Sequence, residues 1–275
     1  MSEQPLQGKV ALVTGAASAT GLGRAMSLAL IRAGARVAIL DIDEQGLKDR
    51  ANEAQLAGEA DSITGIVGDV ANPEDAERAV QETIARLGAL HILVNNAGIN
   101  PSIDSSGAWI SSTSISPEAW VEAIGVNTTG PFLMARSAAR HLVTQGWGRI
   151  IGITTSFDTM IRSAPYGPSK AAHEALVAVM ARELDGTGVT ANVLIPGRAA
   201  NTEMAGRLRN RRTLLAPEVM QEPIVWLASA SSDGFNGCRL IAEFWDEGLP
   251  LDQRLAKASA PAAWPQLGRQ ASRPE

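Results

Sequence analysis

The sequence has one cysteine, Cys238, and one tyrosine, Tyr166, among 275 residues. A single cysteine excludes an internal disulfide and fits a reducing compartment, where such a thiol is usually a small buried group. The histidines, His91, His141 and His173, lack the spacing of metal ligands. We therefore predict no metal site.

Long apolar runs and an excess of positive charge are also missing. No stretch approaches the roughly 18 apolar residues of a membrane span, and the N-terminus lacks the basic and apolar regions of a secretory signal. The formal net charge of −5 indicates no basic surface for nucleic acid or anionic lipid. We therefore expect a cytoplasmic protein that binds neither nucleic acid nor a membrane.

The sequence does contain a regular alternation of two patterns. Short apolar runs, typical of strands buried on both faces, occur at 10–13, 37–40, 62–67, 91–94, 149–153 and 190–195. Segments with helical periodicity occupy 22–34, 44–57, 73–86, 117–145 and 168–185. This order predicts an α/β protein with a Rossmann-like fold, a doubly wound parallel β-sheet with helices on both faces.

The boundaries of these elements follow from local signals. Pro73 and Pro117 suit the first turn of a helix, and Asn72 and Ser116 before them are suitable N-caps. No linker divides the chain, so we predict one domain over 1–250. Because prolines stand among alanines beyond it, we predict an irregular C-terminal extension over 251–275.

A glycine-rich stretch, TGAASATGLGRA at 14–25, joins the first predicted strand to the first predicted helix. Glycines there permit a tight turn that a bulky polar group can approach, and free N–H groups at a helix start favour phosphate. We predict a pyrophosphate site formed by Gly15, Ser18, Thr20, Gly21, Leu22 and Gly23. Since the spacing is not the usual G-x-G-x-x-G, a glycine-rich surface turn is the alternative interpretation.

Asp41 closes the second predicted strand, in VAILD. A carboxylate at that position can accept both hydroxyls of a ribose and would repel a 2′-phosphate. Neither Ser18 nor Ile42 supplies a compensating cation, although Arg24 can still contact a phosphate. The expected cofactor is therefore NAD rather than NADP.

Tyr166 and Lys170 stand four residues apart at the start of a predicted helix, so their side chains share one face. An unperturbed phenol has a pKa of about 10, and a neighbouring ammonium or nicotinamide cation would favour the phenolate. The pair can therefore act as a general acid and base. An amphipathic Tyr–Lys pair with no chemical role is the alternative.

Further motifs accompany the glycine turn and YGPSK at 166–170: GDV at 68–70, NNAG at 95–98, VNTTGPF around Asn127 and IPG at 195–197. Taken together, these motifs resemble the single-domain short-chain dehydrogenases/reductases over roughly residues 6–245. The resemblance implies the fold already predicted. It also implies a substrate lid over about 198–216 and a second wall of the substrate site over 100–114.

The resemblance assigns further residues to the cofactor. By it, Asp69 and Val70 flank the adenine. Along the rest of the cofactor it places Asn95, Ala97 and Gly98, and at the nicotinamide end Ile195, Pro196, Gly197 and Thr202.

Asn127 has a second, physical reason for attention. Pro131, four residues on, has no N–H to donate to the Asn127 carbonyl, which is left free to hold a water. Members of the resembling family pass protons through such a water to the active-site lysine. The alternative is a simple kink at Gly130–Pro131.

Two departures from the family pattern affect the site. The glycine turn is two residues longer than usual, and the hydroxyl that polarises the carbonyl is ambiguous. Strand register favours Thr155, whereas the residue type favours Ser156, which we prefer. Either hydroxyl can donate to a substrate oxygen.

The expected protein is an NAD-preferring oxidoreductase that interconverts a secondary alcohol and a ketone, with Tyr166 as the acid and base. The alternatives are a non-catalytic NAD-binding regulator and an epimerase or dehydratase with no net cofactor turnover. The family likeness also implies a homotetramer or homodimer. Basic residues in the predicted lid are interpreted either as a site for an acidic substrate group or as a solvated face: Arg207, Arg209, Arg211 and Arg212.

Overall fold

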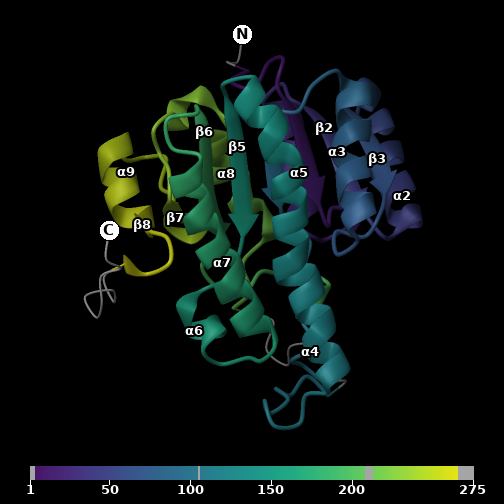
Figure 1. Cartoon of the computed structure of the whole chain (residues 1–275), viewed down its shortest axis with the longest axis vertical. Helices are drawn as coiled ribbons and strands as arrows, with labels where there is room; N and C mark the ends of the chain where they lie inside the picture. The colour runs from purple at the N-terminus through teal and green to yellow at the C-terminus, as the bar shows by residue number, and fades with distance from the viewer. Residues whose placement is uncertain (1–3, 105, 208–212, 266–275) are drawn as a thin grey trace.

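A computed structural model describes residues 4–104, 106–207 and 213–265 (Figure 1). Its sheet has the strand order β3-β2-β1-β4-β5-β6-β7-β8, and every neighbouring pair is parallel except β7 and β8. The strands are β1 (Val10–Thr14), β2 (Arg36–Asp41), β3 (Ile63–Val67), β4 (Ile92–Asn95), β5 (Gly148–Ile153), β6 (Val189–Ile195), β7 (Cys238–Ile241) and β8 (Ser259–Pro261).

Helices cover both faces of this sheet. They are α1 (Leu22–Arg32), α2 (Glu44–Leu56), α3 (Pro73–Leu87), α4 (Pro117–Ile124), α5 (Gly130–Thr144), α6 (Phe157–Met160), α7 (Tyr166–Glu183), α8 (Gln221–Ala228) and α9 (Leu251–Ala258). Figure 1 shows α3, α5 and α7 in front of the sheet and α8 behind it. The prediction of a doubly wound α/β fold is confirmed.

Alternate residues of each central strand enter two separate cores. On β1, Ala11 and Val13 pack in the core under α1 and α8, whereas Val10 and Leu12 pack in the core under α3, α5 and α7. Both cores are buried because helices cover the two sheet faces. This is why the strands read as continuous apolar runs rather than as an alternation of apolar and polar residues.

Side-chain caps begin two of the helices as the sequence predicts. The Asn72 side chain accepts hydrogen bonds from the N–H groups of Glu74 and Asp75 at the start of α3, and Ser116 accepts from Ala119 at the start of α4. Each cap satisfies backbone donors that the helix itself leaves unpaired.

A π-helical segment, Gly125–Thr129, joins α4 to α5, so the predicted helix over 117–145 is one rod with a bulge. The N–H of Gly130 bonds to the carbonyl of Gly125, five residues back. Pro131 follows directly and has no N–H to donate to the Asn127 carbonyl. The bulge therefore lies where proline interrupts the regular bonding pattern, and it carries Asn127 inward, where this residue is fully buried.

The prediction of an irregular extension after residue 250 is wrong for the described part of that segment. Residues Leu251–Ala258 form α9, and Ser259–Pro261 form β8, which pairs antiparallel with β7. Pro250 precedes the helix and Pro261 ends the strand, so these prolines flank regular structure rather than interrupt it.

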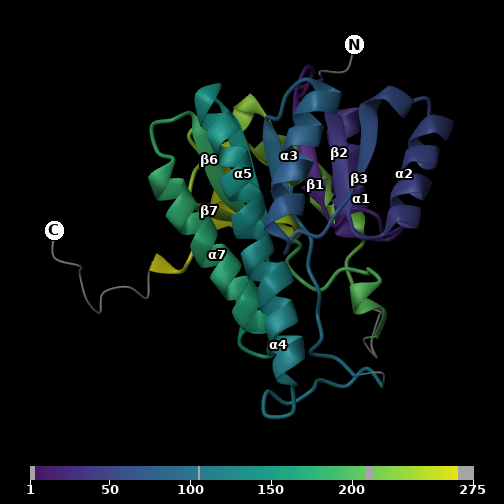
Figure 2. The same ribbon diagram turned by 45° about the vertical axis from the view of Figure 1, so that its right-hand side comes forward.

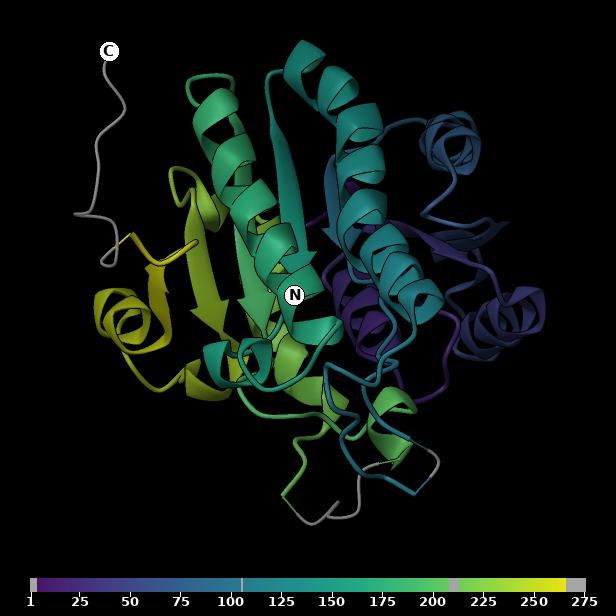
Figure 3. The same cartoon turned by 60° about the horizontal axis from the view of Figure 1, so that its bottom comes forward.

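The carboxyl ends of the parallel strands gather at the lower end of Figure 1, where α4 and α6 also lie. Figure 2 shows α4 and α7 running beside each other toward that end, and the two helices are in contact. Figure 3 brings the same end forward, with the segments that follow β4 and β6 projecting from it. In open α/β sheets this end forms the ligand crevice.

Among the described residues, no helix is long and apolar enough to cross a bilayer.

Replacing the N-cap residue of α3 tests whether this cap stabilises the fold. We expect Asn72→Ala to lower the free energy of unfolding by about 1 kcal/mol, because two first-turn N–H groups lose their acceptor. Asn72→Asp retains that acceptor and should unfold like the parent protein. Denaturant titration followed by circular dichroism measures both variants. Equal stability of the alanine and aspartate variants would show that the cap contributes nothing.

Candidate active site

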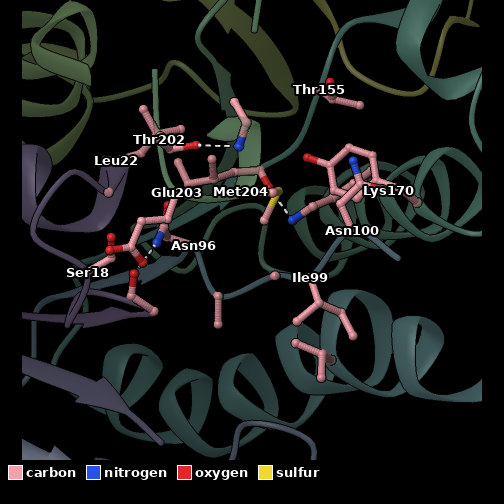
Figure 4. A pocket seen from close by; sticks show the side chains of 18 of the residues that line it. Ser18, Leu22, Asn96, Ile99, Asn100, Thr155, Lys170, Thr202, Glu203 and Met204 are labelled. Atoms are coloured by element: carbon pink, nitrogen blue, oxygen red, sulfur yellow. Dashed lines mark hydrogen bonds between the residues drawn. The ribbon is translucent and has the colours of Figure 1, made fainter. Parts of the chain in front are cut away.

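A pocket of about 600 Å³ lies at the carboxyl ends of the strands. Figure 4 shows Thr155 and Lys170 toward one end of it and Ser18 and Leu22 toward the other. Asp41, at the end of β2, also lines the pocket. Its size is within the range of small-molecule and cofactor sites.

The glycine turn after β1 is folded against the segment after β4. Gly15 has a φ of +67°, and a Cβ there would lie 2.6 Å from the Ala97 Cα. A Cβ on Gly23 would lie 2.5 Å from the Gly15 carbonyl oxygen. Side chains larger than hydrogen are therefore excluded at both positions, and the turn approaches α1 closely.

Two polar side chains hold this turn in place. Asn96 Nδ2 donates to the carbonyls of Thr14 at 2.9 Å and Gly15 at 2.8 Å. The Thr14 hydroxyl accepts from the N–H groups of Asn96 and Ala97, both at 3.0 Å. The ends of β1 and β4 are thus joined by partly buried hydrogen bonds at the pocket wall.

Helix α1 begins at Leu22 without a side-chain cap and has no acidic residue in its first turn. Its first N–H groups are not paired within the helix, and the helix dipole places partial positive charge there. Ser18, Gly21 and Leu22 line the pocket at this point. The turn therefore fits the pyrophosphate of a dinucleotide.

Asp41 faces the pocket and also braces the glycine turn. One carboxylate oxygen accepts from the Ala17 N–H at 3.0 Å and the other from the Asp43 N–H at 3.2 Å. Arg24, the possible phosphate contact, instead pairs with Glu53 and does not line the pocket. Of Asp41 and Arg24, only the negatively charged Asp41 therefore lines the pocket.

Helix α7 brings Tyr166 and Lys170 to the other end of the pocket. Lys170 is 3% exposed, and its Nζ donates to the Ile153 carbonyl at 2.9 Å. Burial disfavours the ammonium and lowers the pKa of Lys170 to about 8.

The Tyr166 hydroxyl is protonated well above neutral pH. Burial raises the pKa of Tyr166 to about 12, and a hydrogen bond from the Thr155 side chain opposes this rise. The Lys170 ammonium donates to the Ile153 carbonyl, and the expectation that it lowers the tyrosine pKa stays a prediction. In this state the phenol is a proton donor.

Thr155, not Ser156, is the hydroxyl at the pocket, which corrects our preference for Ser156. The Ser156 Oγ accepts from the Thr159 N–H at 3.2 Å and so caps α6. Thr155 lines the pocket, and its side chain acts to lower the pKa of Tyr166. The residue type misled the assignment, whereas the strand register was correct.

Asn127 lies behind the pocket rather than in its wall. Its Oδ1 accepts from the Ile99 N–H at 2.8 Å, and its Nδ2 donates to the Ile99 carbonyl and to Ser169 Oγ, both at 2.9 Å. The side chain therefore ties the segment after β4 to α7. The water relay from its carbonyl stays a prediction.

The structure brings most of the predicted site residues to the pocket. Those in its wall are Gly15, Ser18, Gly21, Leu22, Asp41, Ile42, Asp69, Val70, Ala97, Gly98, Thr155, Tyr166, Lys170, Pro196 and Thr202. Those that do not line it are Thr20, Gly23, Asn95, Asn127, Ser156, Ile195 and Gly197. Asn95 was expected to line the cofactor site, but it is buried in β4 and donates to the Pro131 carbonyl at 3.2 Å.

Other wall residues had weak or no sequence signals. Trp109 lines the pocket and is 52% exposed. Asn96 stands within NNAG, but only its two carbonyl contacts reveal its role. The predicted lid and second wall contribute Asn100, Ile103, Arg198, Ala199, Ala200, Glu203, Met204 and Ala205. The arginine cluster of the predicted lid lies outside the described side chains.

No group of three or more His, Cys, Asp or Glu residues suited to a metal ion occurs in the described part of the chain.

A family model described as short chain dehydrogenase matches residues 9–213. The chain is 38% identical to a short-chain type dehydrogenase/reductase of Picea abies over 204 residues, 71% of this chain and 72% of that protein. It is 37% identical over 211 residues to an NADPH-dependent aldehyde reductase-like protein, chloroplastic, of Arabidopsis thaliana, with 73% of this chain and 75% of that protein covered.

A solved structure shares the same architecture. The 3-ketoacyl-(acyl-carrier-protein) reductase from Brucella melitensis, complexed with NADH, superposes with a TM-score of 0.75 at 26% identity. The match covers 84% of this chain and 95% of that one. With the glycine turn, the pocket and the Tyr166–Lys170 pair already in place, these likenesses identify the chain as a member of the short-chain dehydrogenase/reductase family of oxidoreductases.

Proposed function

We propose that this protein is an NAD-preferring oxidoreductase that interconverts a secondary alcohol and a ketone, with Tyr166 as general acid and base. The observation that carries the proposal is that Thr155, Tyr166 and Lys170 line the same pocket as the glycine turn and Asp41. The bound nicotinamide supplies the hydride acceptor for oxidation or the donor for reduction.

Three side chains of the protein would transfer the proton and stabilise the developing charge. The Tyr166 phenol donates its proton to a ketone oxygen during reduction and recovers it from an alcohol during oxidation. Thr155 donates to the same oxygen, where negative charge develops. A protonated Lys170 places positive charge beside the forming phenolate.

For the cofactor, the glycine turn and the start of α1 would hold the pyrophosphate, and Asp41 the adenosine ribose. Pro196 and Thr202, after β6, would hold the nicotinamide end. Apolar wall residues near the substrate end, including Ile103 and Met204, would exclude water from the reacting groups.

Removing the phenolic hydroxyl tests the acid–base assignment. We expect Tyr166→Phe to reduce turnover on a panel of alcohols and ketones by about 10²-fold or more, with cofactor affinity retained. Nicotinamide absorbance measures turnover, and protein fluorescence measures cofactor binding. Near-normal turnover with cofactor bound would make the assignment wrong.

Because Tyr166 is the only tyrosine, its ionisation can be observed directly by tyrosinate absorbance. We expect a midpoint at a pH of about 12 in the folded protein and about 10 in denaturant. Between these values the unfolded chain loses its proton first, so stability falls as the pH rises from about 10 to about 12. A folded-state midpoint near 10, with circular dichroism unchanged, would contradict the burial of this hydroxyl.

Cofactor preference is tested at Asp41. Asp41→Asn removes the charge that opposes a 2′-phosphate but keeps one carbonyl acceptor. We expect the ratio of kcat/KM with NAD to that with NADP to fall by about tenfold or more. The matched control is Asp43→Asn, since Asp43 caps α2 and does not line the pocket. A parent protein that works better with NADP would overturn the preference.

A further inference from the structure

A carboxylate and a guanidinium are buried together behind the Thr155 end of the pocket. Glu174, on α7, has no exposed surface, and Arg239, on β7, is 7% exposed. Arg239 Nε donates to Glu174 Oε1 at 3.1 Å, and Nη2 donates to Oε2 at 2.9 Å. The paired contacts fix the guanidinium plane relative to the carboxylate.

This ion pair contacts both residues that follow strand β5. Arg239 Nη2 also donates to the Thr155 carbonyl at 2.6 Å, and the Thr154 hydroxyl donates to Glu174 Oε2 at 3.1 Å. Beyond them the chain enters α6 at the Ser156 cap. The pair therefore holds the main chain where the site's hydroxyl residue leaves the sheet.

The same helix face carries the other groups of the site. Tyr166, Lys170 and Glu174 follow one another at intervals of four residues on α7, a spacing that keeps side chains on one face. Lys170 contacts the Ile153 carbonyl, and Glu174 contacts Thr154. Consecutive residues at the end of β5 are thus located by successive turns of α7.

The C-terminal segment adds to this arrangement. The Ala263 N–H donates to Glu174 Oε1 at 3.3 Å, and the Trp264 ring lies 5.7 Å from that of Phe157 in α6. Ala263 and Trp264 both have positive φ values, of 58° and 51°. Residues other than glycine adopt this conformation only when surrounding contacts hold it.

Stability alone is a poor reason for such a pair. Removing two charges from water costs free energy that their attraction often fails to recover, and well-packed apolar residues in their place are frequently as stable. What an apolar pair lacks is a donor for the Thr155 carbonyl. That contact connects the pair to the chemistry.

We propose that the Glu174–Arg239 ion pair is a positioning device that fixes the main chain of Thr155, so that the Thr155 hydroxyl stays in the pocket wall that it shares with Tyr166. Both residues act through Thr155 and contact neither substrate nor cofactor. The effect on turnover rests on the function proposed above, whereas the effect on the surroundings of the Tyr166 ring does not.

The test is the double variant Glu174→Gln with Arg239→Met. It leaves no unpaired buried charge, keeps one carbonyl acceptor at residue 174 for either Thr154 or Ala263, and removes the donor to the Thr155 carbonyl. We expect kcat to fall about tenfold with the Kd for NAD unchanged, since a small displacement of an oriented group is costly. The single variant Arg239→Lys keeps both the positive charge and Glu174. We expect its kcat to lie between those of the parent protein and the double variant.

The matched control removes another buried guanidinium from the far end of β5. Arg149 is 1% exposed and pairs with Asp233. Arg149→Leu with Asp233→Asn should change the free energy of unfolding but not the kcat of the folded enzyme. If the control lowers kcat as much as the Glu174–Arg239 variant, the loss is a general effect of weakened structure and the proposal fails.

Two measurements distinguish a positioning role of the ion pair from a contribution to the stability of the protein. In a Thr155→Val background the double variant should cause no further loss of kcat, because the residue it acts through has lost its hydroxyl. Independent additive losses would overturn the proposal.

The other readout needs no turnover. The single tyrosine, replaced biosynthetically by a ring-fluorinated one, gives one fluorine NMR resonance in the apoprotein. We expect the double variant to shift it in the same direction as Thr155→Val does, and the Arg149 control to leave it in place. An unshifted resonance in the double variant rejects the proposal. If the parent protein turns over no alcohol or ketone, the proposed function fails while this readout still decides the positioning role.

Discussion

The packing of α7 against the end of β5 is the contact on which the rest of the site depends. It places a lysine ammonium in a nearly closed environment, with the Ile153 carbonyl as its hydrogen-bond partner. A charge so buried is tolerated only where it is hydrogen-bonded or neutralised. The helix and strand therefore have little freedom to slide past each other. The side chains that they carry are held at fixed positions relative to one another.

Burial acts on the two titratable groups of α7 in opposite directions. It raises the pKa of Tyr166 and lowers that of Lys170, because in each case the charged form loses solvation. The result is a proton donor next to an amine that titrates close to physiological pH. Groups whose pKa values are displaced in this way within one cleft are characteristic of acid–base sites.

The fold was largely predictable because its determinants are local. Each buried strand is an apolar run, and the caps Asn72 and Ser116 mark helix starts through contacts spanning three residues or fewer. The error after residue 250 has the same origin. Prolines were interpreted as interrupting regular structure, whereas the pairing of β8 with β7 joins residues 19 to 23 positions apart.

The residues of the site could be predicted only where they belong to a recognisable sequence motif. Tyr166 and Lys170 follow from their spacing, but Thr155 and Ser156 are neighbours whose sequence separation from Tyr166 does not distinguish them. What distinguishes them is the start of α6, which engages the Ser156 hydroxyl. Asn96 and Arg239 act through contacts to main-chain carbonyls distant in sequence, and no sequence pattern records such contacts.

Strand β8 has a consequence for how this molecule meets others. An outer strand with free main-chain donors and acceptors is a template on which foreign chains can add and aggregate. Here the outermost strand is three residues long and ends in proline, which has no N–H to offer. The C-terminal segment thereby leaves this margin of the sheet a poor starting point for edge-to-edge polymerisation.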